Sequence, residues 1–382
     1  MTNQAGDKRV KLGLLFDFQA TWMGGITYVI NLVKTLNYLD DKDKPEVVFF
    51  YTSELEKHLG DIKYPYITFV KKTTPSIIKG FWKSWMSRKN LFVDDLIEEH
   101  ELDAVYPNRN YPIKTRTKAK VIAWYADLQH KYYPEFFTKE TLIHRAIRLF
   151  FMLRNTSDLV VSSQAVKDDF SKFYKLKKRL KIHVYHFVTI NEDFEEVSKE
   201  VLNSKYNCPD EYFMVCNQFH THKNHKAVLL ALAELKKRGV KKHIVFTGSF
   251  PQNKQSPYIA ELLRIIEENQ LEDQISMLKL IPRQDQIQLM KNSQAIIQPS
   301  LFEGWSTVIE DARSLQVPVV ASNIPVNIEQ VGEFAKFFNA EKYMELADIL
   351  VEMPKRDMQA KIYEDYGQRI KVEAENFLKV FN

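Results

Sequence analysis

The stretch KLGLLFDFQ, residues 11–19, begins the pattern that decides the fold. It is a compact apolar run of the kind that forms a buried parallel strand. The glycine pair Gly24 and Gly25 follows, and ITYVINLVKTLNYL then carries apolar residues at helical spacing from Ile26 to Leu39. A strand, a glycine loop and a helix in this order indicate the first unit of an α/β domain.

Short apolar strands between helical stretches recur after this unit. They are EVVFFYT (46–52), AVYP (104–107), KVIAWYAD (120–127) and DLVVSS (158–163). The alternation predicts a doubly wound parallel sheet, in which ligands bind at the carboxyl ends of the strands.

The character of the chain changes at KIHVYHFVTINEDF (181–194), and a second strand–helix series runs from YFMVCNQF (212–219) to PVVAS (318–322). A chain of 382 residues is also long enough for two cores. We therefore predict two Rossmann-like domains, residues 1–188 and 189–360, followed by a charged, amphipathic helical segment, 361–382. Two tandem α/β domains predict a ligand cleft between them.

Composition narrows the class of protein further. Apolar residues make up 45% of the chain, which indicates a globular protein. The two cysteines, Cys208 and Cys216, do not suggest a disulfide framework. The start MTNQAGDKRV lacks an apolar signal core, and no apolar run reaches the roughly 18 residues that span a bilayer. These features predict a cytoplasmic protein.

Positive charge is concentrated between Ile62 and Val93, where seven lysines and arginines occur without any acidic residue. Within KGFWKSWMSRKN (79–90), tryptophans alternate with these bases, and the predicted patch is Trp82, Lys83, Trp85, Arg88 and Lys89. Such a cluster attracts anionic surfaces, and indoles favour the headgroup level of a membrane. The alternatives are a solvated lysine-rich face and nucleic-acid binding, of which the latter is not expected.

Three acids occur in SLFEGWSTVIEDARSLQVPVVAS (300–322), namely Glu303, Glu310 and Asp311. Ser306 or Thr307 is a suitable N-cap for the helix that follows. Taking Thr307 as the cap gives Glu310 the position of a capping-box glutamate, which is a structural role. The free N–H groups at this helix start, with the helix dipole, form an anion site suited to a diphosphate.

FEGWSTVIEDARSLQVPVVAS resembles the Glu-x7-Glu segment of the retaining glycosyltransferases of family 4, which have the two-domain GT-B fold. The resemblance implies that Glu303 contacts the sugar of a nucleotide-sugar donor and that Asp311 binds the ribose, with Glu310 as the alternative. It also implies that Ser306, Thr307 and Val308 hold the diphosphate. In this fold the final helix often returns to the first domain.

VCNQFHTHKNH (215–225) resembles a second segment of the family. Lys223 would neutralise the leaving diphosphate, and Asn217 and Gln218 would lie in the same donor site. Gln218 stands where the family usually has an arginine. Three nearby histidines (His220, His222 and His225) lack the regular spacing of metal ligands, so we predict no metal site.

Weaker resemblances complete the series. WYADLQHKYYPEFF (124–137) is similar to the family's histidine loop, which implies that His130 contacts the donor sugar. The pair Gly24 and Gly25 matches the glycine loop near the phosphates. LIPRQDQIQLM (280–290) resembles the loop that grips the nucleotide base and implicates Ile281 and Arg283.

The resemblance predicts a metal-independent, retaining hexosyltransferase-like enzyme without a cofactor. Its partners would be a nucleotide sugar and a glycan or lipid-linked acceptor at an anionic membrane surface, as in surface polysaccharide or lipopolysaccharide assembly. The alternative is a catalytically silent GT-B protein that binds a nucleotide sugar, which Gln218 keeps open.

Overall fold

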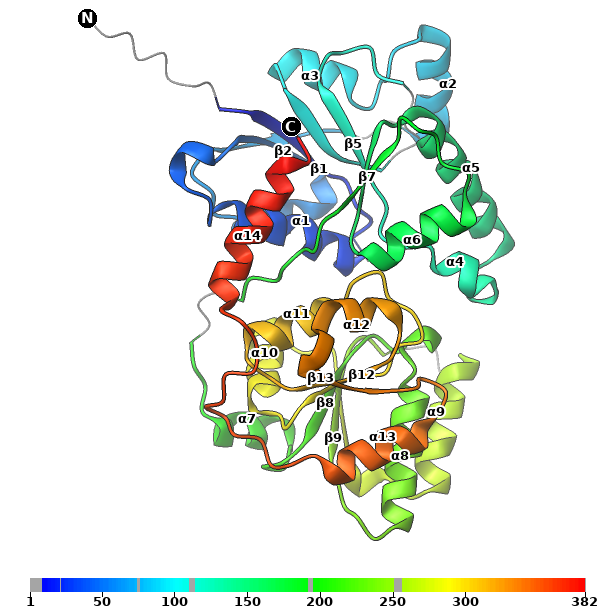
Figure 1. Cartoon of the computed structure of the whole chain (residues 1–382), viewed down its shortest axis with the longest axis vertical. Helices are drawn as coiled ribbons and strands as arrows, with labels where there is room; N and C mark the ends of the chain where they lie inside the picture. Colours follow the sequence, from blue (N-terminus) through cyan, green and yellow to red (C-terminus); the bar gives the residue numbers. More distant parts are fainter. Residues whose placement is uncertain are drawn as a thin grey trace, which may run out of the picture. The chain divides into compact units, whose positions relative to one another are not determined.

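The computed structural model describes residues 9–20, 22–73, 76–109, 114–191, 195–250 and 256–381. These residues form two compact units, shown in Figure 1. The first unit comprises described residues of Met1–Val188 and Gly367–Asn382, and the second comprises those of Thr189–Tyr366.

The described part of the first unit is built on a seven-stranded parallel sheet. Its strands are β1 (Lys11–Phe16), β2 (Glu46–Tyr51), β3 (Ile67–Lys71), β4 (Ala104–Asn108), β5 (Lys120–Trp124), β6 (Asp158–Val161) and β7 (Lys181–Val184). They are ordered β3-β2-β1-β4-β5-β6-β7, so the direction of winding reverses between β1 and β4. The central strands β1, β2 and β4 are buried along nearly their whole length, which explains their continuous apolar runs.

Helices connect these strands (Figure 1). They are α1 (Met23–Leu36), α2 (Ile77–Ser87), α3 (Asp94–His100), α4 (Gln129–Tyr132), α5 (Lys139–Asn155) and α6 (Gln164–Phe173). The expected glycine loop is wrong in one respect, because α1 begins at Met23 and therefore includes Gly24 and Gly25. A Cβ on Gly25 would lie 2.5 Å from the Phe18 ring, so this close approach requires glycine.

The second unit has a six-stranded parallel sheet within the described residues. Its strands are β8 (Phe213–Cys216), β9 (Ile244–Thr247), β10 (Ile275–Lys279), β11 (Ile296–Gln298), β12 (Val319–Ser322) and β13 (Ala335–Phe338). The order is β10-β9-β8-β11-β12-β13, and the winding reverses between β8 and β11.

Helices cover both faces of this second sheet. They are α7 (Lys199–Tyr206), α8 (His225–Lys237), α9 (Pro257–Glu268), α10 (Arg283–Asn292), α11 (Thr307–Ser314), α12 (Pro325–Val331) and α13 (Tyr343–Glu352). Phe213 and Val215 of β8 pack into the same core cluster as α8, α9 and α13, whereas Met214 and Cys216 pack with α7, α10 and α11. This alternation confirms the doubly wound architecture predicted from the sequence.

The last helix, α14 (Tyr366–Lys379), packs on the first unit. The Phe377 ring lies 5.3 Å from that of Tyr106 and 5.1 Å from that of Tyr185, and Lys371 forms an ion pair with Asp40. The second unit extends to Tyr366, so the boundary expected at 361 lies within it. Across the described ranges, no helix combines the length and apolarity needed to span a membrane.

Candidate functional site

The point where the second sheet reverses its winding brings together several of the residues singled out in the sequence. Asn217 directly follows β8, Gln298 ends the neighbouring strand β11, and Glu303 lies in the loop after β11. Loops at such a switch point diverge and leave room for a ligand at the carboxyl ends of the strands. The site is therefore positioned by the topology of the sheet.

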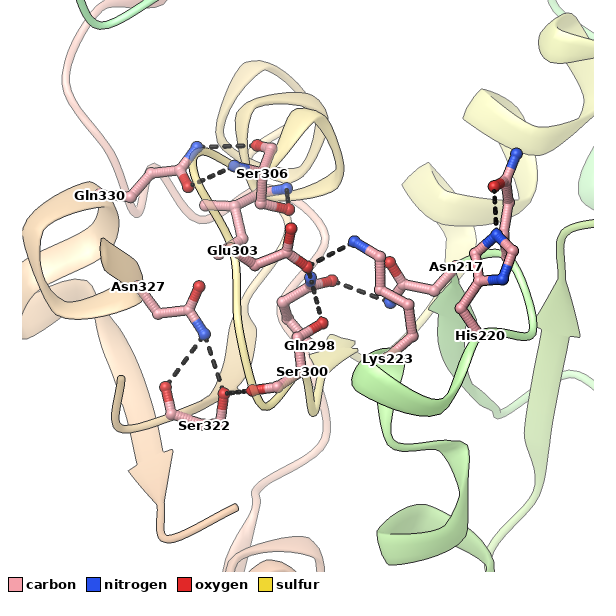
Figure 2. Close-up of polar contacts among 12 residues, drawn as sticks. Asn217, His220, Lys223, Gln298, Ser300, Glu303, Ser306, Ser322, Asn327 and Gln330 are labelled. Atoms are coloured by element: carbon pink, nitrogen blue, oxygen red, sulfur yellow. Dashed lines mark hydrogen bonds and ion pairs between the residues drawn. The ribbon is translucent and has the colours of Figure 1, made fainter. Parts of the chain in front are cut away.

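Glu303 is the centre of a polar network drawn in Figure 2. Its Oε1 accepts hydrogen bonds from Lys223 Nζ at 2.5 Å and from Gln298 Nε2 at 2.7 Å. Gln298 Oε1 in turn accepts from Asn217 Nδ2 at 3.0 Å. The side chains of Lys223 and Glu303 are only 19% and 8% exposed, so the pair is largely shielded from water. The structure thus joins three predicted residues through Gln298, which the sequence did not indicate.

A tight turn presents Lys223 to Glu303. Lys223 ends a 3₁₀ turn, Thr221–Lys223, and Asn224 adopts a left-handed conformation with φ 53° before α8 begins. Asn224 Nδ2 donates to the carbonyl oxygens of Pro299 and Ala340, which ties the turn to the loop after β11. Asparagine suits this position because its side chain tolerates the left-handed region and bonds to nearby backbone.

The start of α11 is capped by one of the two predicted residues, but without the expected capping box. Ser306 is the N-cap, and its Oγ accepts from Ile309 N at 3.3 Å. Ser306 N donates to Gln330 Oε1 at 3.1 Å, so the expected capping box between Thr307 and Glu310 is wrong. The first intrahelical bond runs from Glu310 N to Ser306 O. The amides of Thr307 and Val308 precede it and are oriented for an external acceptor.

Glu310 nevertheless has a structural role. Its side chain is fully buried, and its carboxylate accepts from Gln330 Nε2 at 2.9 Å, from Tyr366 OH at 3.0 Å and from Arg313. Buried carboxylates are stable only with such partners. Gln330 therefore links the helix cap to Glu310, and this carboxylate is committed to holding α11 in place.

Asp311 lies one position further, and its carboxylate meets another predicted residue. Its Oδ1 accepts from Arg283 Nη2 at 2.5 Å and from Asn191 Nδ2 at 3.1 Å, although Asp311 is only 1% exposed. Arg283 is the first residue of α10 rather than part of a loop, and Ile281 packs partly buried against the core beside it. Two residues assigned separately to ribose and base thus lie in one cluster, together with Asn191.

The histidines after β8 differ in their exposure, from His220 at the surface to the buried His225. Gln218 Oε1 lies 3.0 Å from His220 Nε2, and both side chains are exposed. Burial, reinforced by the Lys223 charge, lowers the pKa of His222 to about 4, so its imidazole is neutral near pH 7. Among the residues that the structure describes, no group of three His, Cys, Asp or Glu side chains could hold a metal ion.

One further requirement of the site was not visible in the sequence. Gly248 follows β9 with φ 145°, and a Cβ there would lie 2.1 Å from the carbonyl oxygen of Asn217. Only glycine allows β8 and β9 to bring their carboxyl ends this close. Gly248 therefore fixes the backbone from which Asn217 reaches Gln298.

His130 lies in the first unit, in the short helix α4 after β5. It is 6% exposed, and its Nδ1 is 3.5 Å from Arg145 Nη1. Burial, aided by the charges of Arg145 and Lys131, lowers the pKa of His130 to about 4. The imidazole is therefore neutral near pH 7.

Arg109, directly after β4, was not singled out in the sequence, and its guanidinium lies 4.3 Å from the Phe18 ring.

Comparisons with known proteins bear on the second unit and on the fold of the whole chain. Residues 198–369, which contain the network around Glu303, match the family model described as Glycosyl transferases group 1. Nearly the whole chain is similar in structure to proteins with two Rossmann-like domains, and the fold is GT-B. Together they show the GT-B fold for the chain and a glycosyltransferase match for the second unit.

Individual relatives agree with this class. Over 92 residues the chain is 35% identical to glycosyltransferase 1 domain-containing protein 1 of Xenopus tropicalis, covering 23% of this chain and 27% of the relative. The chain thus matches about a quarter of that relative's length.

Two solved structures resemble it along most of their length. Alr3699/HepE of Anabaena, in complex with UDP-glucose, has a TM-score of 0.63 at 16% identity and covers 96% of this chain and 99% of its own. Sucrose-phosphate synthase of Thermosynechococcus elongatus has a TM-score of 0.63 at 15% identity, covering 98% and 96%. At these identities the likeness shows the fold alone.

Proposed function

We propose that this protein is a retaining glycosyltransferase that moves a sugar from a nucleoside diphosphate donor to a glycan or lipid-linked acceptor. The observation that supports it most is the shielded pair of Lys223 and Glu303 at the switch point of the second sheet. A cation that can meet a phosphate and a carboxylate that can meet a sugar lie side by side, as transfer from a nucleotide sugar requires.

The departing diphosphate is the group that the site must stabilise. Lys223 has three N–H donors, one of which reaches Glu303. Its other donors can bind the diphosphate, together with the amides of Thr307 and Val308 at the start of α11. A lysine and a helix N-terminus then supply the electrostatic stabilisation without a metal ion.

Glu303 orients the donor sugar. Its Oε1 accepts from Lys223 and Gln298, so Oε2 can accept from a sugar hydroxyl. Asp311 binds the ribose, because its Oδ2 has no hydrogen-bond partner among the described residues, whereas both carboxylate oxygens of Glu310 are held by structural partners. The neutral imidazole of His130 hydrogen-bonds to the sugar rather than acting as a cation.

The remaining donor contacts and the acceptor are proposed on the family resemblance. Ile281 and Arg283 contact the base, and Asn217 and Gln218 line the donor site. The acceptor belongs to surface polysaccharide assembly. UDP-sugars are the first donors to test, because a structural relative was solved with UDP-glucose.

The test is a panel of UDP-, GDP- and ADP-sugars, scored by thermal shift and by release of the nucleoside diphosphate. We expect nucleotides of one base to stabilise the protein and a sugar donor with that base to be turned over. NMR should show that the product keeps the anomeric configuration of the donor. Lys223→Ala should lower turnover by about 10²–10³, and Glu303→Ala should also lower it. If a donor binds but is not turned over with any acceptor, the protein is instead a catalytically silent GT-B protein. Gln218, in the position of the family's usual arginine, keeps this outcome open.

A further inference from the structure

The helix α2 exposes an unusually apolar face. Ile78, Trp82, Trp85 and Met86 recur at helical spacing and are between 56% and 74% exposed. Two tryptophans held in water are costly, since burial of each indole would remove a large apolar area from solvent. Lys79 and Lys83 lie on the same exposed part of the helix.

The neighbouring helix α5 carries a second exposed apolar stripe. Ile143, Ile147 and Phe150 follow one another at intervals of four and three residues, and each is at least 44% exposed. Arg154 continues the same stripe one turn later and is also exposed. The opposite face of α5 supplies Leu149 and Met152 to the core, so this helix is apolar on two sides.

The two stripes form one surface. The Phe81 ring of α2 lies 4.8 Å from the Phe151 ring of α5, and Figure 1 shows these helices next to each other in the first unit. Trp82 lies 6.3 Å from Phe81, and Phe150 lies 5.2 Å from Phe151. Ring contacts therefore run without interruption from one exposed stripe to the other. We call this surface, formed by Ile78, Trp82, Trp85, Met86, Ile143, Ile147 and Phe150, the α2–α5 face.

The charges around the α2–α5 face are mainly positive. Lys79, Lys83 and Arg88 lie in or directly after α2, which contains no acidic residue. On α5 the exposed bases are Lys139 and Arg154, whereas Arg145 and Arg148 are turned toward Phe137 and Tyr125. Lys89, which the sequence analysis included in the patch, instead pairs with Asp95 at 2.5 Å and Glu98 at 3.2 Å. The patch therefore extends toward α5 and excludes Lys89.

We propose that the α2–α5 face docks on an anionic lipid bilayer. Exposed indoles and aliphatic side chains favour the headgroup level, and the surrounding bases are complementary to anionic lipids. Two exposed tryptophans and an exposed phenylalanine beside Lys79, Lys83, Arg88 and Arg154 are complementary to both the apolar and the anionic part of such a surface. The inference does not depend on which sugar the second unit binds, or on whether it transfers one.

The experiment is flotation of the full chain with vesicles of phosphatidylcholine alone or with 40% phosphatidylglycerol at about 0.1 M salt. We expect binding to the anionic vesicles only. Lys79→Gln with Lys83→Gln should weaken it roughly 25-fold, at about fivefold for each lysine near the surface. Trp82→Ser with Phe150→Ser should weaken it at least tenfold, which corresponds to the loss of about 1.4 kcal/mol or more.

Matched controls lie in the second unit. Leu263→Ser removes another exposed apolar residue, 42% exposed on α9, and Lys237→Gln removes another exposed lysine. Neither should change vesicle binding, and thermal melting checks that all variants are folded. Absence of binding to anionic vesicles would overturn the proposal. So would a wild-type dimer, by light scattering, that Trp82→Ser with Phe150→Ser converts to a monomer, because a second copy would then cover this face.

Discussion

The Lys223–Glu303 pair allows a quantitative prediction about the ligand-free protein. Lys223→Met removes the cation but keeps the bulk of the side chain. Glu303→Gln removes the negative charge but keeps an oxygen that can accept the hydrogen bond from Gln298 Nε2. Combining the two changes in a double-mutant cycle isolates the energy of the pair from the effects of each substitution alone.

The expected coupling follows from the burial of the two side chains. Opposite charges about 4 Å apart attract by about 4 kcal/mol at the effective dielectric constant of a protein surface. Desolvation of groups that are 8% and 19% exposed offsets part of this attraction. We therefore expect a net coupling of about 2 kcal/mol in the free energy of unfolding of the second unit. Either single substitution should cost more than the double one, because it leaves one shielded partner unpaired.

Hydrogen exchange in increasing urea is the assay, because the two units can open separately. Peptides that contain β8 and β11 report on the second unit. Lys226 and Glu261 form the control pair, 2.6 Å apart in the same unit but 45% and 34% exposed. Exposed pairs contribute about 0–1 kcal/mol. A coupling between Lys223 and Glu303 no larger than that of the control pair would refute the idea that the site shields them.

Three further predictions concern stability and donor binding. In urea unfolding, Gly248→Ala should destabilise the second unit by about 3 kcal/mol or more. The control Gly239→Ala, at φ 73° with no atom within 4 Å of the added Cβ, should cost about 1 kcal/mol. Equal costs would contradict the close approach between Gly248 and Asn217. Glu310→Gln should lower the melting temperature more than Asp311→Asn does, and Asp311→Asn should weaken donor binding more than Glu310→Gln does. The opposite pattern would exchange the roles of the two acids. Folding lowers the pKa of His130 from 6.5 to about 4. Between these pH values the unfolded chain binds a proton at His130 that the folded chain does not, so the stability of the fold decreases as the pH falls from 6.5 to about 4. His130→Asn should therefore lose less stability than wild type between pH 7 and 5, and parallel losses would refute this.

The inner strands of both units could be predicted from the sequence, because buried parallel strands are short apolar runs. The edge strands β3, β7 and β13 were not predicted, because they are only partly buried and lack such a run. The same runs place Asn217 directly after β8 and Glu303 in the loop after β11, and the carboxyl ends of neighbouring parallel strands meet at one edge. Lys223 could be placed for the same reason.

Contacts between segments distant in sequence could not be predicted in this way. Nothing in AIIQPS (295–300) marks Gln298 as a site residue, yet its side chain bridges Asn217 and Glu303. The capping box of Glu310 was wrong because Ser306 and Thr307 are both suitable caps and the structure uses Ser306, whose amide donates to Gln330 of α12. Sequence spacing carries no information about such partners.

Charged pairs show the same limit on the surface. The run of bases around Trp82 was visible, but the neutralisation of Lys89 depends on Asp95 and Glu98 of α3. The apolar stripe of α5 was also missed, because an apolar residue on a helix is usually assigned to the core. Only the packed structure shows that Phe150 lies outside it.

The release of nucleoside diphosphate from the preferred donor, measured as an initial rate for wild type, Lys223→Ala and Lys226→Ala, tests the central claim most directly. If Lys223 stabilises the departing diphosphate, its replacement should lower the turnover rate by about 10²–10³, as loss of one such electrostatic contact does elsewhere. Lys226→Ala, which removes an exposed lysine of the same helix region, should stay within about twofold of wild type, because surface pairs contribute little. A Lys223→Ala variant that keeps more than about a tenth of the wild-type rate would contradict the account, since a loss that small is under about 1.4 kcal/mol of transition-state stabilisation.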